Sequence, residues 1–197
     1  MDEFEKLIDK NNKIKYLELL EYISTISLMD FISEITCPFI LGKGLFEGDL
    51  FKDPEADCTS TMRFRLDPEM LAKVKNVETQ NCRPDKETTA SAISKAIYVV
   101  TKRRDSYDTR KNVITIGRSL DNDLTIADYV ISKRHAAIHV FSDEYFIEDL
   151  GSTNGVSING MKLDVNNKIK LSYGDTIAFG RYSFVFTKPI ELFNRMR

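Results

Sequence analysis

The chain has 197 residues, of which 42% are hydrophobic and 29% charged, and this length fits one or two domains. The apolar share is typical of a globular protein and too high for a chain that is disordered throughout. The 28 basic and 30 acidic residues leave a net charge of −2, whereas proteins that coat nucleic acid carry a clear basic excess. We therefore expect a folded protein whose partners do not include nucleic acid.

The amino-terminal part predicts neither export nor membrane insertion. The first ten residues are acidic and lack the apolar stretch of a secretory signal peptide. The most apolar window, residues 16–35, contains Glu18, Glu21, Asp30 and Glu34. Each acidic residue would cost about 2.5–3.5 kcal/mol at the centre of a membrane-spanning helix. We expect a cytoplasmic protein without a membrane partner.

The cysteines and histidines are too few and too dispersed for metal or redox chemistry. Cys37, Cys58 and Cys82 are odd in number and form no CxxC pair, which is the spacing of zinc and thioredoxin sites. His135 and His139 are four residues apart with no glutamate between them, so they form no HExxH motif. The sequence predicts free thiols, no metal site and no cofactor.

Two segments near the start repeat apolar residues at helical spacing. Residues 16–23 and residues 28–35 each place apolar side chains three or four positions apart, as one face of an amphipathic helix requires. Ser27 followed by Asp30 matches the residues that cap the start of a helix. We expect both helices to pack into a core, the alternative being a partner surface. They belong to a predicted N-terminal region, mainly α or α+β, over residues 1–80.

After these helices the pattern becomes shorter and more polar. Residues 61–66 alternate like a strand, and Asp67-Pro68 matches the start of a short helix. The following stretch, residues 76–91, is polar and rich in turn-forming residues. It predicts a linker, which we place at residues 81–94.

From residue 96 onward the chain is typical of short strands separated by turns. Its charge changes as well, because residues 1–93 carry a net charge of −6 and residues 94–189 carry +3. Asn159-Gly160 is the pair that a two-residue type I′ hairpin prefers, since both turn positions need a positive φ. Short strands with regular turns predict an all-β sandwich or barrel. The predicted strands span residues 97–101, 113–117, 136–140, 145–149, 168–171, 176–179 and 182–187.

Three short motifs lie where predicted strands and loops meet. They are Gly117-Arg118, residues 132–135 with the sequence Ser-Lys-Arg-His, and residues 149–155, which end in Ser-Thr-Asn-Gly. An arginine fork pairs with two phosphate oxygens at once, and hydroxyls and loop N–H groups can bind the others. An asparagine side chain can pair with the main chain of an extended peptide. If these loops meet at one end of the sandwich, they would form a binding site for a phosphorylated peptide.

The order and spacing of these motifs resemble the forkhead-associated (FHA) domain, whose pattern is Gly-Arg, then Ser-x-x-His, then Ser-x-Asn-Gly. The resemblance covers residues 95–188, just under half of the chain, and no signature position departs from the pattern. It implies an all-β sandwich of about eleven strands whose apical loops recognise phosphothreonine. Selectivity for the residue three positions after the phosphothreonine varies within the family and stays open.

The resemblance also implies which residues contact the phosphate. Arg118 would grip it, and Ser132 would donate its hydroxyl to it. Arg134 would add charge at the phosphate, and Lys133 would contribute its backbone or side chain nearby.

The remaining signature residues have implied roles at the edge of the site or in its framework. Thr153 and Asn154 would line the site, with Asn154 holding the main chain of the peptide. Gly117, His135 and Gly155 would be architectural, and the His135 imidazole would join one binding loop to another.

Two charged segments near the motifs have a plainer interpretation. Residues 121–123, with the sequence Asp-Asn-Asp, form an acidic loop beside Arg118. We expect this loop to be solvated, the alternative being contact with the ligand. Residues 102–104, with the sequence Lys-Arg-Arg, predict a solvated strand end rather than a nucleic-acid patch.

These features together predict a phosphothreonine-binding adaptor downstream of a Ser/Thr kinase, with no catalytic residues. Its partner would be a threonine-phosphorylated protein, such as a kinase or a kinase substrate. The alternative is a phospho-independent structural component that uses the sandwich as a scaffold for protein interactions. Residues 1–93 resemble no family that we recognise. An enzyme there is disfavoured, because they contain no histidine, no nucleophile motif and no phosphate-binding glycine loop.

Self-association through phosphorylation is a further expectation. Residues 86–90, with the sequence Lys-Glu-Thr-Thr-Ala, resemble the phosphorylated segment of some small bacterial FHA regulators. In this family the chain enters the sandwich at the end opposite the binding loops. A stretched chain spans at most about 3.3–3.6 Å per residue, so Thr88 and Thr89, which lie only a few residues before the first predicted strand, would hardly reach the loops of their own domain. Binding in trans, which would give an oligomer, stays open. The predicted divisions are residues 1–80, the linker 81–94, the FHA domain 95–188 and a C-terminal tail 189–197.

Overall fold

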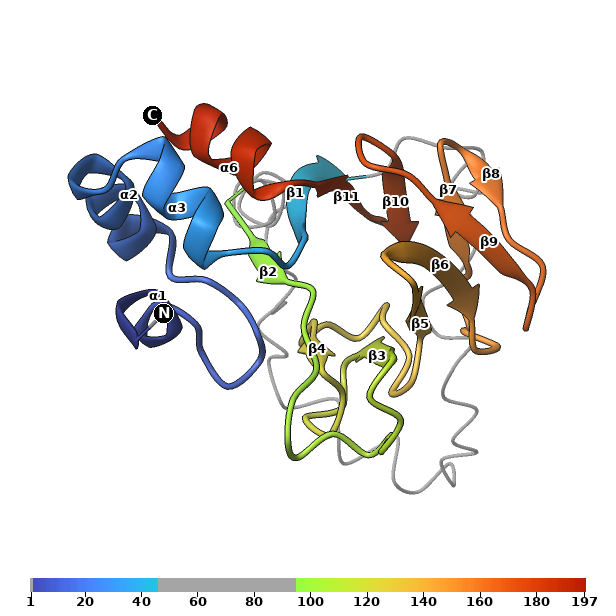
Figure 1. Cartoon of the computed structure of the whole chain (residues 1–197). Helices are drawn as coiled ribbons and strands as arrows, with labels where there is room; N and C mark the ends of the chain where they lie inside the picture. Colours follow the sequence, from blue (N-terminus) through green and yellow to red (C-terminus); the bar gives the residue numbers. More distant parts are fainter. Residues whose placement is uncertain (1, 46–94) are drawn as a thin grey trace, which may run out of the picture.

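The computed structural model describes residues 2–45 and 95–197, which form a β-sandwich with helices packed at one end (Figure 1). One sheet has six strands in the order β2-β1-β11-β10-β7-β8, and the other has five in the order β4-β3-β5-β6-β9. The strands are β1 (Phe39–Leu45), β2 (Ile97–Val99), β3 (Val113–Gly117), β4 (Leu124–Thr125), β5 (Ala136–Phe141), β6 (Glu144–Asp149), β7 (Val156–Ile158), β8 (Met161–Lys162), β9 (Lys168–Leu171), β10 (Thr176–Phe179) and β11 (Tyr182–Thr187). The predicted fold class, an all-β sandwich of about eleven strands preceded by a helical region, is confirmed.

The main core fills the space between the two sheets. Successive residues of a strand point to opposite faces, so alternate residues can face inward. Ile114 and Ile116 of β3 pack there against Ile138 of β5 and Phe184 of β11. Burial of apolar surface stabilises the fold by about 25 cal/mol per Å². This core fixes the strands and leaves the connecting loops at the ends of the sandwich free to form a surface.

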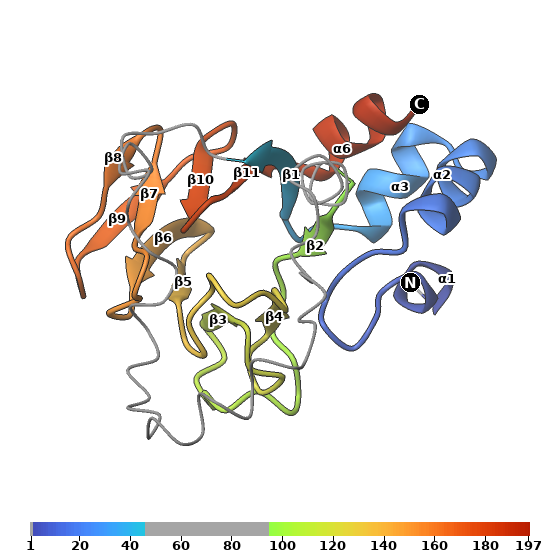
Figure 2. The same ribbon diagram turned by 180° about the vertical axis from the view of Figure 1, so that it is seen from behind.

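Helices form a second apolar core on the opposite face of β1 and β2, and both views show them gathered at this end of the six-stranded sheet (Figures 1 and 2). In β1, Ile40 points into the sandwich core, whereas Phe39 and Leu41 pack with the helices. These two strands are therefore covered on both faces. The helices are α1 (Asp2–Lys6), α2 (Tyr16–Thr25), α3 (Leu28–Glu34) and α6 (Pro189–Met196).

The two helices predicted from apolar spacing are confirmed as α2 and α3, and their stripes lie in the second core. The predicted cap of α3 is also present. The Ser27 hydroxyl accepts a hydrogen bond from the Asp30 N–H at 3.2 Å and donates to the Asp30 carboxylate at 2.6 Å. None of the helices in residues 2–45 and 95–197 is long and apolar enough to span a membrane.

The predicted division between an N-terminal region and the sandwich differs from the structure. Residues 39–45, assigned to the N-terminal region, form β1, which pairs with β11 on one side and with β2 on the other. Two glycines conceal this strand in the sequence, and the register shifts between Gly42 and Gly44, as at a β-bulge. The predicted tail contains α6, whose Phe193 ring lies 5.2 Å from that of Phe31.

The predicted strands of the second half are all present, and β3, β9, β10 and β11 have the predicted bounds. The predicted hairpin is confirmed, because Asn159 and Gly160 have φ of 51° and 84° between the paired strands β7 and β8. Strands β4, β7 and β8 were not predicted, since two or three residues are too few to show alternation. The elements predicted at residues 61–66 and 68–75 and the linker at 81–94 lie outside the described residues.

The packing of α3 predicts a large difference between two neighbouring substitutions. Phe31 is fully buried in the second core, so Phe31→Ala should lower the free energy of unfolding by about 3–5 kcal/mol. Met29 lies on the same helix and is 70% exposed, so Met29→Ala should change it by at most about 0.5 kcal/mol. Urea denaturation followed by circular dichroism measures both values, and equal losses would contradict this packing.

Candidate functional site

Three loops that carry the signature residues meet at one end of the sandwich. Arg118 directly follows β3, Ser132 precedes β5, and Thr153 lies in the loop between β6 and β7. The Arg118 N–H donates to the Ser132 carbonyl oxygen at 3.0 Å. The Thr153 N–H donates to the Ser132 hydroxyl oxygen, also at 3.0 Å. Ser132 thus contacts both other loops, and the structure brings the predicted residues together.

A buried histidine joins two of these loops. His135 Nδ1 accepts a hydrogen bond from the Ser132 N–H at 3.0 Å, and His135 Nε2 lies 3.2 Å from the Gly155 carbonyl oxygen. A ring nitrogen that accepts carries no proton, and a nitrogen that faces a carbonyl must donate. Both contacts together therefore require the neutral imidazole with its proton on Nε2.

The surroundings of His135 favour this neutral form. The residue is fully buried, and its ring meets that of Phe179 edge to face at 5.8 Å. Burial lowers the pKa of His135 below the ordinary value of 6.5, while the hydrogen bond to Gly155 and the charge of Asp149 act in the opposite direction. Because burial disfavours the charged form, the ring stays neutral and both of its hydrogen bonds persist.

Close backbone contact explains the glycine before Arg118. A Cβ atom at Gly117 would lie 2.3 Å from the Lys133 carbonyl oxygen and 2.9 Å from Asn122 Nδ2. A larger residue at this position would push apart the two loops that Arg118 and Ser132 occupy. Gly155 has φ of +80°, a conformation that side chains rarely adopt.

The acidic loop after Arg118 is more buried than its composition predicts. Asn122 and Asp123 are both fully buried, so the expectation of a solvated loop is wrong for these two residues. The Asn122 side chain donates to the Ser119 carbonyl at 2.8 Å and to the Lys133 carbonyl at 2.7 Å. Asn122 therefore ties the Arg118 loop to the Ser132 loop. The sequence gives little indication of this role, because only a small polar pair, directly before a very short strand, marks the position.

The site carries three cationic side chains that lack an acidic partner. Arg118, Lys133 and Arg134 are exposed, and none of them forms an ion pair with a carboxylate in the described part of the chain. The Arg134 guanidinium lies over the Tyr107 ring, 3.9 Å from its centroid, which leaves its charge uncompensated. The surface is therefore suited to a ligand that carries more than one negative charge.

The third loop adds polar groups beside these charges. The Thr153 hydroxyl lies 3.4 Å from the Ser132 hydroxyl. The Asn154 side chain donates through Nδ2 to the Val130 carbonyl oxygen at 2.7 Å. Its Oδ1 has no hydrogen-bond partner among residues 2–45 and 95–197, so it can accept an N–H from a ligand. One of the two Nδ2 hydrogens is used by Val130, so Asn154 can still pair with both main-chain groups of a peptide, through Oδ1 and its second N–H.

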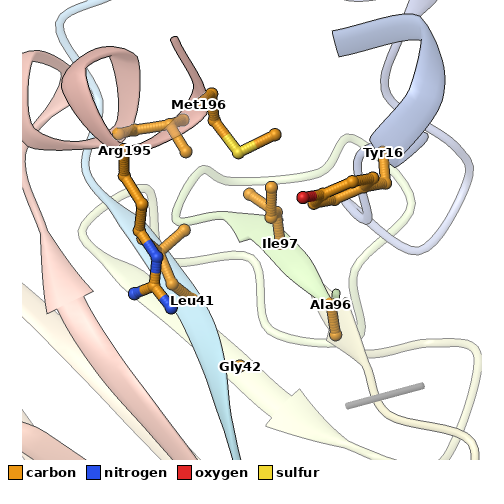
Figure 3. Close-up of a pocket in the computed structure, with 8 residues that line it drawn as sticks. Tyr16, Leu41, Gly42, Ala96, Ile97, Arg195 and Met196 are labelled. Carbon is orange, nitrogen blue, oxygen red and sulfur yellow. The ribbon is translucent and has the colours of Figure 1, made fainter. Parts of the chain in front are cut away.

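A small pocket lies away from this site, between α2, α6 and the strands β1 and β2 (Figure 3). Its volume is about 90 Å³, and Leu41, Ile97 and Met196 line it with apolar groups, while Tyr16 and Arg195 add polar ones. It contains none of the predicted site residues. In the part of the chain that the structure describes, no cluster of three histidine, cysteine or acidic residues could hold a metal ion.

Comparison with known proteins assigns a family to the segment that carries these loops. The FHA domain model matches residues 114–180. An oxoglutarate dehydrogenase inhibitor of Corynebacterium jeikeium is 28% identical over 137 residues, which cover 68% of this chain and 90% of that protein. The glycogen accumulation regulator GarA of Mycobacterium tuberculosis is 31% identical over 74 residues, which cover 38% of this chain and 44% of GarA.

Solved structures of FHA proteins are similar as well. The FHA domain of an Arabidopsis thaliana protein is 35% identical, with a TM-score of 0.37, and the match covers 39% of this chain and 66% of that one. Mycobacterium tuberculosis EmbR, in complex with a phosphopeptide, is 30% identical with a TM-score of 0.37, and the match covers 42% of this chain and 21% of EmbR. The chain thus spans less than half of GarA and about a fifth of EmbR. Residues 114–180 of this chain form an FHA domain.

Proposed function

We propose that the three loops bind a peptide or protein that carries a phosphothreonine. The observation that supports this most directly is that Arg118, Lys133 and Arg134 are exposed and lack acidic partners in the described residues. They lie on two loops that the hydrogen bond from the Arg118 N–H to the Ser132 carbonyl oxygen joins. A phosphothreonine carries about −1.5 to −2 charges at pH 7, whereas threonine carries none. Most of the discrimination between the two would therefore come from charge-assisted contacts.

The proposed contacts follow from the groups that each residue leaves available. The Arg118 guanidinium would pair with two phosphate oxygens through its planar fork. The Ser132 hydroxyl would donate to the phosphate, and Lys133 and Arg134 would add charge beside it. Asn154 would accept an N–H of the peptide main chain through its Oδ1 atom.

Four further residues would shape the site rather than supply its charge. Thr153 would line it next to the Ser132 hydroxyl. Gly117, His135 and Gly155 would hold the loops at their observed separation through close contacts and hydrogen bonds. A preference for phosphothreonine over phosphoserine would come from burial of the γ-methyl group, which is worth about 0.8 kcal/mol or roughly fourfold in affinity.

At the level of the whole protein, we propose a cytoplasmic adaptor downstream of a Ser/Thr kinase, not an enzyme. The FHA match over residues 114–180 supports this role. Its partner would be a threonine-phosphorylated protein such as a kinase or kinase substrate. Phosphorylation-dependent self-association would need a phosphothreonine of this chain, and its predicted sites, Thr88 and Thr89, lie outside the described residues.

Substitution of Arg118 tests the proposed function. Arg118→Ala should weaken binding to a pool of peptides with one central phosphothreonine by about 2–5 kcal/mol, which makes micromolar binding undetectable. Arg118→Lys should also lose most of the affinity, because an ammonium group cannot form the bidentate contact. Fluorescence anisotropy with the labelled peptide pool measures these affinities.

The control for this experiment is the same pool with threonine in place of phosphothreonine. Equal binding of the two pools by the wild-type chain would favour a phospho-independent scaffold instead. Wild-type affinity in Arg118→Ala would also contradict the proposed site.

The neutral His135 on which the site depends predicts a pH dependence of stability. The unfolded chain binds the histidine proton near pH 6.5, while burial lowers the pKa in the folded state. The free energy of unfolding should therefore fall as the pH decreases below 6.5, by up to about 1.4 kcal/mol per pH unit. Burial also lowers the pKa of His139, so the measurement is made in His139→Gln. Urea denaturation of this variant between about pH 5 and 7.5 isolates His135, and a flat profile would argue against a neutral imidazole.

A further inference from the structure

A segment outside the FHA signature holds the loop that carries Arg118. This segment, residues 101–110, lies between β2 and β3, and we call it the brace. The Arg103 guanidinium donates through Nη1 to the carbonyl oxygens of Leu120 at 3.1 Å and of Asn122 at 3.0 Å. One arginine of the brace therefore binds two backbone carbonyls just after Arg118.

The same segment also contacts the second cationic group of the site. The Tyr107 N–H donates to the Asp121 carbonyl oxygen at 2.8 Å. The Tyr107 ring lies beneath the Arg134 guanidinium, 3.9 Å from its centre, at a distance typical of a cation–π contact. The brace thus reaches both sides of the proposed phosphate site.

A buried carboxylate anchors the brace. Asp123 is fully buried and accepts hydrogen bonds from the Arg103 N–H at 2.7 Å and from Lys102 Nζ at 3.0 Å. Its Oδ2 atom also accepts from the N–H and the hydroxyl of Thr115, both at 2.8 Å. A buried charge is stable only when it is paired and its remaining lone pairs are satisfied. The predicted solvated strand end at residues 102–104 is therefore wrong for Lys102 and Arg103.

A second carboxylate orients the Arg103 fork. Asp105 accepts from Arg103 Nε at 3.0 Å and from Nη2 at 2.5 Å. A bidentate contact of this kind fixes the plane of the guanidinium. The remaining nitrogen, Nη1, is thereby directed at the two carbonyl oxygens of the Arg118 loop.

The brace is also attached to the helical part of the protein. Asn12, which precedes α2, is 6% exposed and donates through Nδ2 to the Thr101 carbonyl oxygen at 2.8 Å. Its own carbonyl oxygen accepts the Val99 N–H at 2.9 Å. The first residue of the brace is therefore held by a residue that lies 89 positions earlier in the chain.

We propose that the brace positions Arg118 and Arg134 for the phosphate, with Arg103 and Tyr107 as positioning residues and Asn12 as the anchor. The Arg118 guanidinium has no partner in residues 2–45 and 95–197, so in those residues only the backbone of its loop limits the region that it can reach. A displacement of about 1 Å is enough to spoil a bidentate contact. This inference rests on the proposed function and extends it to residues that make no contact with the ligand.

Removal of the Arg103 fork tests the first positioning residue. Arg103→Met keeps most of the aliphatic stem and removes both hydrogen bonds from the guanidinium to the Arg118 loop, so affinity for the phosphothreonine pool should fall about fivefold to twentyfold. Arg110→Met is the matched control, because Arg110 pairs with Asp108 in the same segment but donates to no carbonyl of that loop. It should bind as the wild-type chain does. Fluorescence anisotropy with the full chain measures both affinities.

Two substitutions of Tyr107 separate its ring from its hydroxyl. Tyr107→Leu removes the aromatic face under Arg134 and should weaken binding about twofold to fivefold. Tyr107→Phe retains that face and should restore the wild-type affinity. If Tyr107 only stabilised the fold, Tyr107→Leu and Tyr107→Phe would lower the thermal midpoint by similar amounts. The two variants would then bind the pool with equal affinity at a temperature where both are folded.

Asn12→Gly is the variant to use if Arg103→Met does not fold. Asn12 has φ of 56°, which glycine adopts freely, so this change removes the carboxamide without straining the backbone. Affinity should again fall about twofold to fivefold.

Hydrogen exchange at the Arg118 and Ser119 amides gives a readout that does not require a ligand. Arg103→Met should accelerate this exchange, and Arg110→Met should not. If wild-type exchange and affinity persist in Arg103→Met while Arg118→Ala abolishes binding, the brace proposal is wrong and the proposed function stands. If the wild-type chain does not distinguish phosphothreonine from threonine, the proposed function fails. The brace proposal, which rests on that function, then fails with it.

Discussion

The candidate site depends on one buried, neutral imidazole. The His135 ring accepts from the Ser132 N–H and donates to the carbonyl of Gly155, which lies 20 residues after His135, so it sets the separation of these two loops. Only the tautomer with its proton on Nε2 can make both bonds, and burial favours a neutral ring. The residues that would meet a ligand are therefore placed by a residue that has no access to it.

Near the site, the cationic side chains are exposed and the Asp123 carboxylate is buried. The cationic groups Arg118, Lys133 and Arg134 are exposed, while the nearby Asp123 carboxylate is buried and satisfied by Lys102 and by backbone and hydroxyl donors. Acidic groups in the exposed position would cancel the positive potential of the site. The burial of Asp123 and its pairing with Lys102 keep this charge from the surface that would attract a phosphate.

The signature of the site could be predicted because its motifs follow predicted strands in the order and spacing of the FHA pattern that the sequence resembles. Once β3 and β5 are placed, Arg118 and Ser132 must come close. The supporting residues could not be predicted, because their contacts are distant in the chain. Arg103 reaches carbonyls 17 and 19 residues away, and Asn12 reaches one 89 residues away. No local pattern marks such contacts.

The helical part and the sandwich share strand β1, whose Ile40 and Phe39 face different cores.

The account as a whole is tested most directly by titrating the ¹⁵N-labelled chain with a phosphothreonine peptide selected from the pool. It predicts saturable shifts in the amide signals of residues 118–119, 132–134 and 153–155, and no shifts with the threonine form of that peptide. Saturable shifts on another surface, with these signals unmoved, would contradict it.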